Sequence, residues 1–134
     1  MKGIERNTTE TEKELKRAAR EALTREVMAL MERQPQEGLH WTGTKTDLLE
    51  ALHIAYVEGS IVDREGCLCT FSHITAQVCS VLHVSVPHNP RAYVARAACR
   101  KGVYRRTFLD RYLYQWHEQG VGQPLHEEVG KAFS

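Results

Sequence analysis

Residues 41–59 read WTGTKTDLLEALHIAYVEG and predict an amphipathic helix over residues 44–58. Thr44 and Asp47 have the spacing of a capping box, which satisfies backbone N–H groups at a helix start. Gly59 stands at the position of a C-cap glycine. The expected buried stripe consists of Leu48, Leu49, Leu52, Ala55 and Tyr56, with Trp41 packed against it.

A second amphipathic helix is expected upstream, over residues 10–34. Apolar side chains recur in it at steps of three and four from Leu15 to Met31, and Pro35 and Gly38 end it. The other face has Glu and Arg residues of both signs, which is typical of a solvated surface. The apolar stripe needs a partner, either the rest of the domain or another chain, so a homodimer through helix 10–34 is one interpretation.

The C-terminal half of the chain predicts three more helices. Residues 71–82 form the first, and residues 90–101 form the second, because an Asn-Pro pair marks its start. The third begins at Thr107, which is followed by Asp110 at capping-box spacing. The connector at residues 60–69 is compatible with a miniature β-hairpin and with a plain loop.

The composition is that of one compact globular domain plus an appendage. The chain has 134 residues, of which 42% are hydrophobic and 26% charged. The expected fold class is all-α, or mainly helical. We expect an N-terminal charged amphipathic helix at residues 1–37, a helical domain at residues 38–120 and a flexible tail at residues 121–134.

The sequence gives little support for a membrane protein, a secreted protein or an enzyme. No stretch approaches the ~18 consecutive apolar residues of a membrane span, and the first residues lack the apolar core of a signal peptide. We therefore expect a cytoplasmic protein, away from membranes, with its cysteines as free thiols. The chain has no glycine-rich phosphate loop, no GxSxG and no HExxH motif, so we expect neither an enzyme nor a small-molecule substrate.

A metal site is the best of the weak cofactor signals. Cys67 and Cys69 lie near His73 in the sequence. A structural zinc site usually has two ligand pairs, and no second pair occurs at suitable spacing. We therefore expect no metal and no other cofactor.

Positive charge is concentrated in one segment. Residues 89–111 contain seven Lys or Arg residues and one acidic residue, a net charge of +6, whereas the whole chain has a net charge of +1. A nearly neutral protein with one basic segment indicates a local anionic partner. A solvated helix face is the alternative interpretation.

Helix 90–101, PRAYVARAACRK, alternates arginines with very small side chains. Tyr93, Val94 and Ala97 fall on one side, which we assign to the core. On the other side, small residues let a backbone approach a surface, and arginine binds phosphate oxygens or guanine edges. Backbone N–H groups at the helix start near Thr107 are also expected to hold a phosphate. The predicted DNA-contacting residues are Arg91, Arg96, Arg100, Lys101, Arg105, Arg106 and Thr107.

A helix pair with a basic second helix is typical of helix-turn-helix recognition of double-stranded DNA. However, the connection at residues 83–89 is longer than the usual turn of this motif, and the alanines of helix 90–101 could instead pack against another helix. Two hypotheses therefore stay open. One is a DNA-binding regulator, and the other is a non-enzymatic protein-interaction or dimerisation module whose arginines hold an acidic partner.

Several sequence blocks resemble the C-terminal domain of the RteC family, in order and in spacing. The first blocks are WTGTKTDLLEAL at residues 41–52, Ala55-Tyr56 and Gly59-Ser60-Ile61. The later blocks are Tyr93, Arg100-Lys101 and RRTFLD at residues 105–110. The resemblance covers about residues 40–117, well over half of the chain.

This resemblance implies a winged-helix-like DNA-binding domain with an extra N-terminal helix. RteC proteins are transcriptional regulators of conjugative transposons that activate excision genes by binding upstream DNA. The resemblance therefore implies a regulator, carried by a mobile element, that controls excision or transfer genes. Helix 10–34 stands where the family has a longer N-terminal domain, which bears on transcriptional activation more than on DNA binding.

Overall fold

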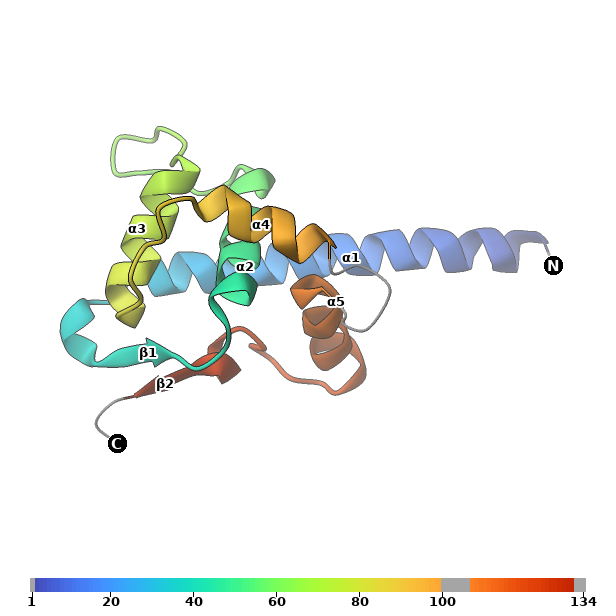
Figure 1. The fold of residues 1–134 in the computed structure, drawn as a ribbon. Helices are drawn as coiled ribbons and strands as arrows, with labels where there is room; N and C mark the ends of the chain where they lie inside the picture. Colours follow the sequence, from blue (N-terminus) through green and yellow to red (C-terminus); the bar gives the residue numbers. More distant parts are fainter. Residues whose placement is uncertain (1, 100–106, 132–134) are drawn as a thin grey trace.

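The computed structural model describes residues 2–99 and 107–131, with side chains described from residue 11 onward. The chain is mainly helical, as predicted, with one small antiparallel sheet (Figure 1). The helices are α1 (Lys2–Met31), α2 (Lys45–Glu58), α3 (Phe71–Leu82), α4 (Pro90–Cys99) and α5 (Phe108–Leu113). The shorter elements are η1 (Pro35–Glu37), β1 (Leu39–Trp41), η2 (Tyr114–Glu118, a π-helical turn), η3 (His126–Glu128) and β2 (Val129–Lys131). Within the described residues, no helix has the length and apolar character that crossing a bilayer requires.

Helix α2 is the centre of the fold, because α1, α3, α4 and α5 all pack against it. The Thr44 hydroxyl accepts a hydrogen bond from the Asp47 N–H at 3.1 Å, and Gly59 closes the helix at φ +71°. The predicted bounds are therefore confirmed to within one residue. Trp41 packs on this helix as predicted, and its indole N–H donates to the Thr44 carbonyl at 2.8 Å. The buried residues of α2 are Asp47, Leu48, Leu49, Glu50, Ala51, Leu52 and Ala55.

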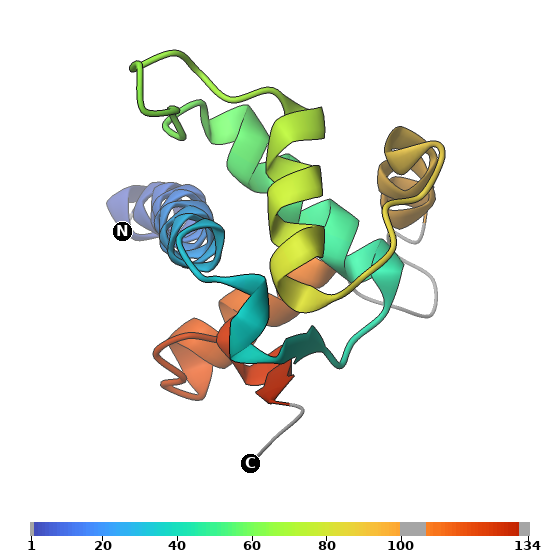
Figure 2. The ribbon, with the colours of Figure 1, turned by 90° about the vertical axis from the view of Figure 1, so that its left-hand side faces the viewer.

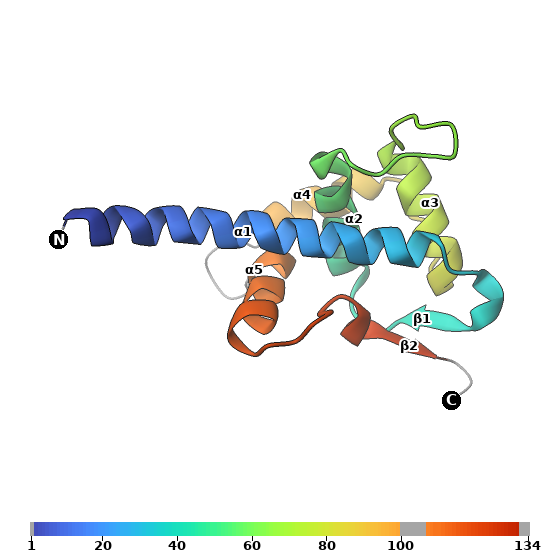
Figure 3. The ribbon, with the colours of Figure 1, turned by 180° about the vertical axis from the view of Figure 1, so that it is seen from behind.

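Helix α1 is longer than the expected helix at residues 10–34, since it begins at Lys2. No proline interrupts residues 2–9, so the helix continues through them. Its apolar stripe packs into the same core as the other helices, so the partner that this stripe needs is the rest of the domain. The boundary expected between residues 37 and 38 therefore does not separate two cores. The N-terminal half of α1 projects beyond the other elements (Figures 1 and 3).

The connector before α3 forms a minimal hairpin, which decides between the two alternatives left open. Val62 and Leu68 form an isolated antiparallel bridge, and the Asp63 N–H donates to the Cys67 carbonyl at 2.8 Å. The Asp63 side chain accepts the N–H groups of Glu65 and Cys67, each at 2.9 Å. This turn chemistry orders a segment that has little apolar burial.

The prediction of a flexible tail is wrong for residues 121–131. Strand β2 pairs antiparallel with β1, and the Glu128 carbonyl accepts the Thr42 N–H at 2.8 Å. Leu125 is fully buried in the core. Each strand is only three residues long and pairs across most of the chain, so local sequence patterns do not reveal it. Residues 132–134 lie outside the described residues.

Candidate nucleic-acid interface

Helix α4 lies on the outside of the molecule, packed against α2 (Figures 1 and 2). It begins at Pro90, as predicted, and is described as far as Cys99. Tyr93 and Val94 are partly buried against the core, and Ala97 is 1% exposed. The assignment of these side chains to the inner face is therefore confirmed.

The outer face of α4 combines two arginines with small residues. Arg91 and Arg96 are exposed, together with Ala95, Ala98 and Cys99. Because these three side chains are small, another surface can approach the helix backbone closely there. The face can therefore come close to an extended ligand while the two guanidinium groups contact it.

Each of the two guanidinium groups lies over an aromatic ring. The Arg91 Cζ atom lies 5.2 Å from the centroid of the Phe71 ring, and the Arg96 Cζ atom lies 4.6 Å from that of Tyr93. Cation–π contacts of this length are attractive and so favour these arginine rotamers. Less conformational entropy is then lost when these side chains bind a ligand.

The positive charge of this face is not neutralised locally. Among the described side chains, neither Arg91 nor Arg96 takes part in an ion pair. By contrast, Arg20 and Arg111 do form ion pairs, with Glu58 at 3.2 Å and with Asp47 respectively. Within the described residues, the two α4 arginines are therefore exposed cations without a carboxylate partner.

The positive charge of this face affects the pKa of His53. Burial lowers the pKa of His53, and the nearby positive charge of Arg91 lowers it further. The imidazole also packs edge-on against Phe71, with ring centroids 5.3 Å apart. Both causes disfavour the charged imidazolium form of His53 beneath the basic face.

The expected phosphate site at the start of α5 is wrong. The Glu50 carboxylate accepts hydrogen bonds from the N–H groups of Phe108 and Leu109, at 3.1 and 3.2 Å. Thr107 is buried, and its hydroxyl accepts the Asp110 N–H at 3.2 Å. These N–H groups already donate to the buried carboxylate of Glu50, so they are not available to a phosphate. The negative charge of that carboxylate would also repel a phosphate. The pairing of residues 50 and 108 is long-range, so the capping pattern around Thr107 alone did not reveal it.

The structure thus leaves both Arg91 and Arg96 exposed on α4, on opposite flanks of its outer side because they are five positions apart, and it places Thr107 inside the fold. The remaining predicted contacts, Arg100, Lys101, Arg105 and Arg106, lie outside the described residues. Within the described part of the chain, no group of three or more His, Cys, Asp or Glu side chains is arranged to hold a metal ion. Cys79 is buried, which raises the pKa of its thiol to about 11.

A buried polar centre at Glu26 was missed by the sequence reasoning. Glu26 is 4% exposed and accepts hydrogen bonds from the Tyr112 hydroxyl at 2.6 Å and from the backbone N–H groups of Leu125 and His126, at 3.2 and 2.9 Å. The Nδ1 atom of His126 also lies 2.6 Å from this carboxylate. Burial and the Glu26 carboxylate raise the pKa of Tyr112. The position of Glu26 in the sequence indicated its burial, because it follows Leu23 by three residues and so falls on the apolar stripe.

The carboxylate of Glu26 joins α1, α5 and the segment before β2. Its oxygens are occupied by donors of the same chain, so the arrangement is structural and offers no open site.

Comparison with known proteins adds no family assignment. No family model, no curated protein and no solved structure matches the chain.

Proposed function

We propose that this chain is a DNA-binding transcriptional regulator related to RteC, carried by a mobile element and controlling its excision or transfer genes. The observation that supports DNA binding is the outer face of α4. Two exposed guanidinium groups, without ion pairs among the described side chains, are spaced there by small residues. Regulation of mobile-element genes rests on the sequence resemblance.

The bound ligand in this proposal is duplex DNA. Phosphates form a regular array along each DNA strand, and a protein binds them with Lys and Arg side chains. Arg91 and Arg96 lie five positions apart on one helix, so they address different points of such an array. The basic sequence around them, with a net charge of +6 over residues 89–111, extends the same electrostatic attraction.

The proposed recognition element is α4 within a helix-turn-helix or winged-helix-like arrangement of α2, α3 and α4. In this arrangement α4 rests on α2, and residues 83–89 form a connection longer than the tight turn of simple helix-turn-helix proteins. The pair β1–β2 lies away from α4 (Figure 1), so the proposal assigns it no contact with DNA.

The test is fluorescence anisotropy with a labelled duplex and the variant Arg91→Ala/Arg96→Ala. Loss of two charge-assisted contacts is expected to weaken binding roughly tenfold or more at moderate salt. The matched control is Arg17→Ala/Arg64→Ala, which removes the same charge from exposed positions away from α4. If both variants bind as wild type does, the α4 face is not the DNA surface. If wild type does not bind duplex DNA, the proposal fails as a whole.

A protein-interaction or dimerisation module is the second candidate, and the projecting half of α1 favours it (Figure 3). The apolar stripe of α1 from Ala19 to Leu30 is buried in the chain's own core, so a homodimer through helix 10–34 would have to use the projecting residues. Sedimentation velocity at several protein concentrations tests this candidate. A dimer is expected to sediment faster as the concentration rises, and a monomer at every concentration would exclude the homodimer.

A further inference from the structure

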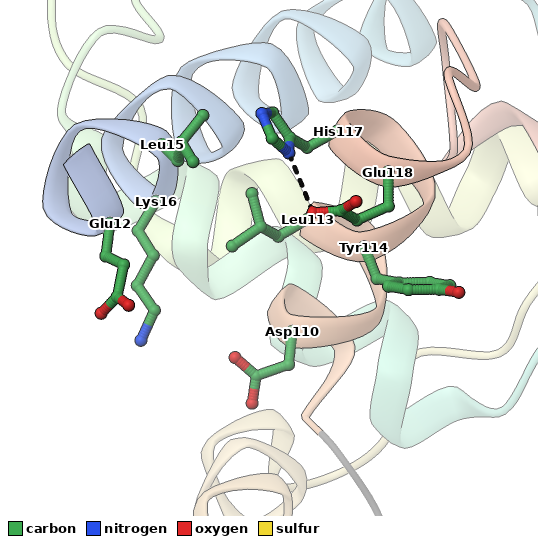
Figure 4. A pocket seen from close by; sticks show the side chains of 8 residues that line it. All are labelled: Glu12, Leu15, Lys16, Asp110, Leu113, Tyr114, His117 and Glu118. Atoms are coloured by element: carbon green, nitrogen blue, oxygen red, sulfur yellow. Dashed lines mark hydrogen bonds and ion pairs between the residues drawn. The ribbon is translucent and has the colours of Figure 1, made fainter. Parts of the chain in front are cut away.

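A groove lies between the projecting half of α1 and the segment formed by α5 and η2 (Figure 4). Its volume is about 410 Å³. Leu15 from α1 and Leu113 from α5 line it, together with Tyr114, which is 46% exposed. The groove thus presents an apolar floor built from two different elements.

The charged side chains of the groove are mainly acidic. Among the described residues, the carboxylates of Glu12, Asp110 and Glu118 line it, and Lys16 is its one ammonium group (Figure 4). His117 Nδ1 lies 3.3 Å from Glu118 Oε1. Among the described side chains, neither Glu12 nor Asp110 is neutralised by an ion pair. An apolar floor with excess negative charge favours an apolar ligand that also has positive charge.

We propose that this groove binds a basic amphipathic segment of a partner protein. The partner inserts one or two apolar side chains between Leu15 and Leu113 and places Lys or Arg beside Glu12 and Glu118. A polyanion is disfavoured here, so this surface differs in chemistry from the basic face of α4. The proposal names the partner class for the interaction candidate and does not depend on DNA binding.

The test uses a fluorescein-labelled helical peptide of leucine, alanine and lysine, and a second peptide in which glutamate replaces every lysine. The first peptide is expected to bind wild type, and the second is not. The variant Glu12→Gln/Glu118→Gln keeps the shape of the groove while removing two charges, and it should weaken binding by roughly fivefold. The control Glu14→Gln/Glu21→Gln removes two exposed charges of α1 that do not line the groove, and it should bind within about twofold of wild type.

Two results would overturn the proposal. The first is equal binding of the lysine peptide to wild type and to the groove variant. The second is self-association of the wild-type chain that Leu15→Ser abolishes, which would assign the groove to a second copy. Duplex-DNA binding by the groove variant should match that of wild type, so a failure of this proposal is distinguishable from a failure of the DNA-binding proposal.

Discussion

Glu26 is a charged residue on the apolar face of α1, and hydrogen bonds from the same chain make its burial tolerable. A buried carboxylate without donors is strongly destabilising, whereas one that accepts several hydrogen bonds can join elements. Here the donors come from Tyr112, Leu125 and His126. These contacts fix α5 and the C-terminal segment to the same point of α1.

Replacing Glu26 with alanine should therefore be severe. The substitution leaves the Tyr112 hydroxyl and two backbone N–H groups without an acceptor, and each unpaired buried donor costs about 1–3 kcal/mol. We expect the free energy of unfolding to fall by about 3 kcal/mol or more, measured by urea denaturation. Glu21→Ala, at an exposed position of the same helix, should change it by less than about 0.5 kcal/mol. A loss for Glu26→Ala as small as that of the control would contradict this role.

The pKa of His53 shows whether the guanidinium group of Arg91 lies near this imidazole. Because Arg91 lowers the pKa of His53, Arg91→Ala should raise that pKa toward its ordinary value. The rise should be partial, since burial is the larger cause and remains in the variant. An NMR titration of the imidazole measures it, with Arg64→Ala as the control. A His53 pKa that is identical in wild type and Arg91→Ala would place the guanidinium elsewhere.

At the scale of elements, the turn η3 places the Glu128 side chain in a partly buried site. Burial raises the pKa of Glu128, Arg111 opposes this rise, and Asp47 adds to it. Its Oε2 atom is buried without a hydrogen-bond partner among the described residues, and a Cβ on Gly43 would lie 2.9 Å from it. The space around this carboxyl is therefore tight, and its ionised form is poorly solvated.

This environment predicts a pH dependence of stability. The folded state holds the Glu128 proton more tightly than the unfolded state, so the favourable contribution is complete below pH 4.5 and is lost as the pH rises through the raised pKa. The Gln side chain of Glu128→Gln does not ionise. The melting temperature of this variant, relative to that of wild type, should therefore rise between pH 4 and pH 7. Thermal unfolding by circular dichroism checks this, with the exposed Glu127→Gln as the control. A difference from wild type that is constant with pH would contradict the prediction.

The elements that could be predicted from the sequence are those with local end signals. Thr44 and Gly59 mark the two ends of α2, and Pro90 marks the start of α4, because caps and proline act within a few residues. Strand β2 has no such signal, since its stability comes from β1 and from the burial of Leu125. The N-terminal extension of α1 was missed because its first residues lack the apolar periodicity on which the prediction relied.

The candidate site was predicted only where one helix determines it. Spacing on α4 was sufficient to place Tyr93 inward and Arg91 and Arg96 outward, because helical geometry fixes the angle between positions. Contacts between distant segments, such as Glu50 with Phe108, were not predictable in this way. Glu50 is a charged residue among leucines, and its partner lies on a different helix.

At the scale of the whole molecule, the buried apolar residues that the structure describes form one core, which runs from α1 to Leu125. A single core of this size should unfold cooperatively. We therefore expect the fluorescence of Trp41 and Trp116 and the far-UV circular dichroism to report the same urea midpoint. Two separate transitions would mean that α1 and the rest of the chain fold as distinct units.

At the same scale, the described residues form two surfaces of opposite charge, the exposed arginines of α4 and the acidic groove beside α1. Such a division lets one molecule bind a polyanion and a cationic protein segment at different places. The basic face of α4 is the surface proposed to bind DNA. If the basic face binds the DNA backbone, binding must release counterions from the duplex.

The salt dependence of duplex binding tests this claim most directly. The logarithm of the affinity should fall linearly with the logarithm of the salt concentration, by about 0.9 for each phosphate contacted. Removing Arg91 and Arg96 together should reduce the slope by about 2. A wild-type affinity that does not change with salt, or a slope that is the same in wild type and the double variant, would contradict the account.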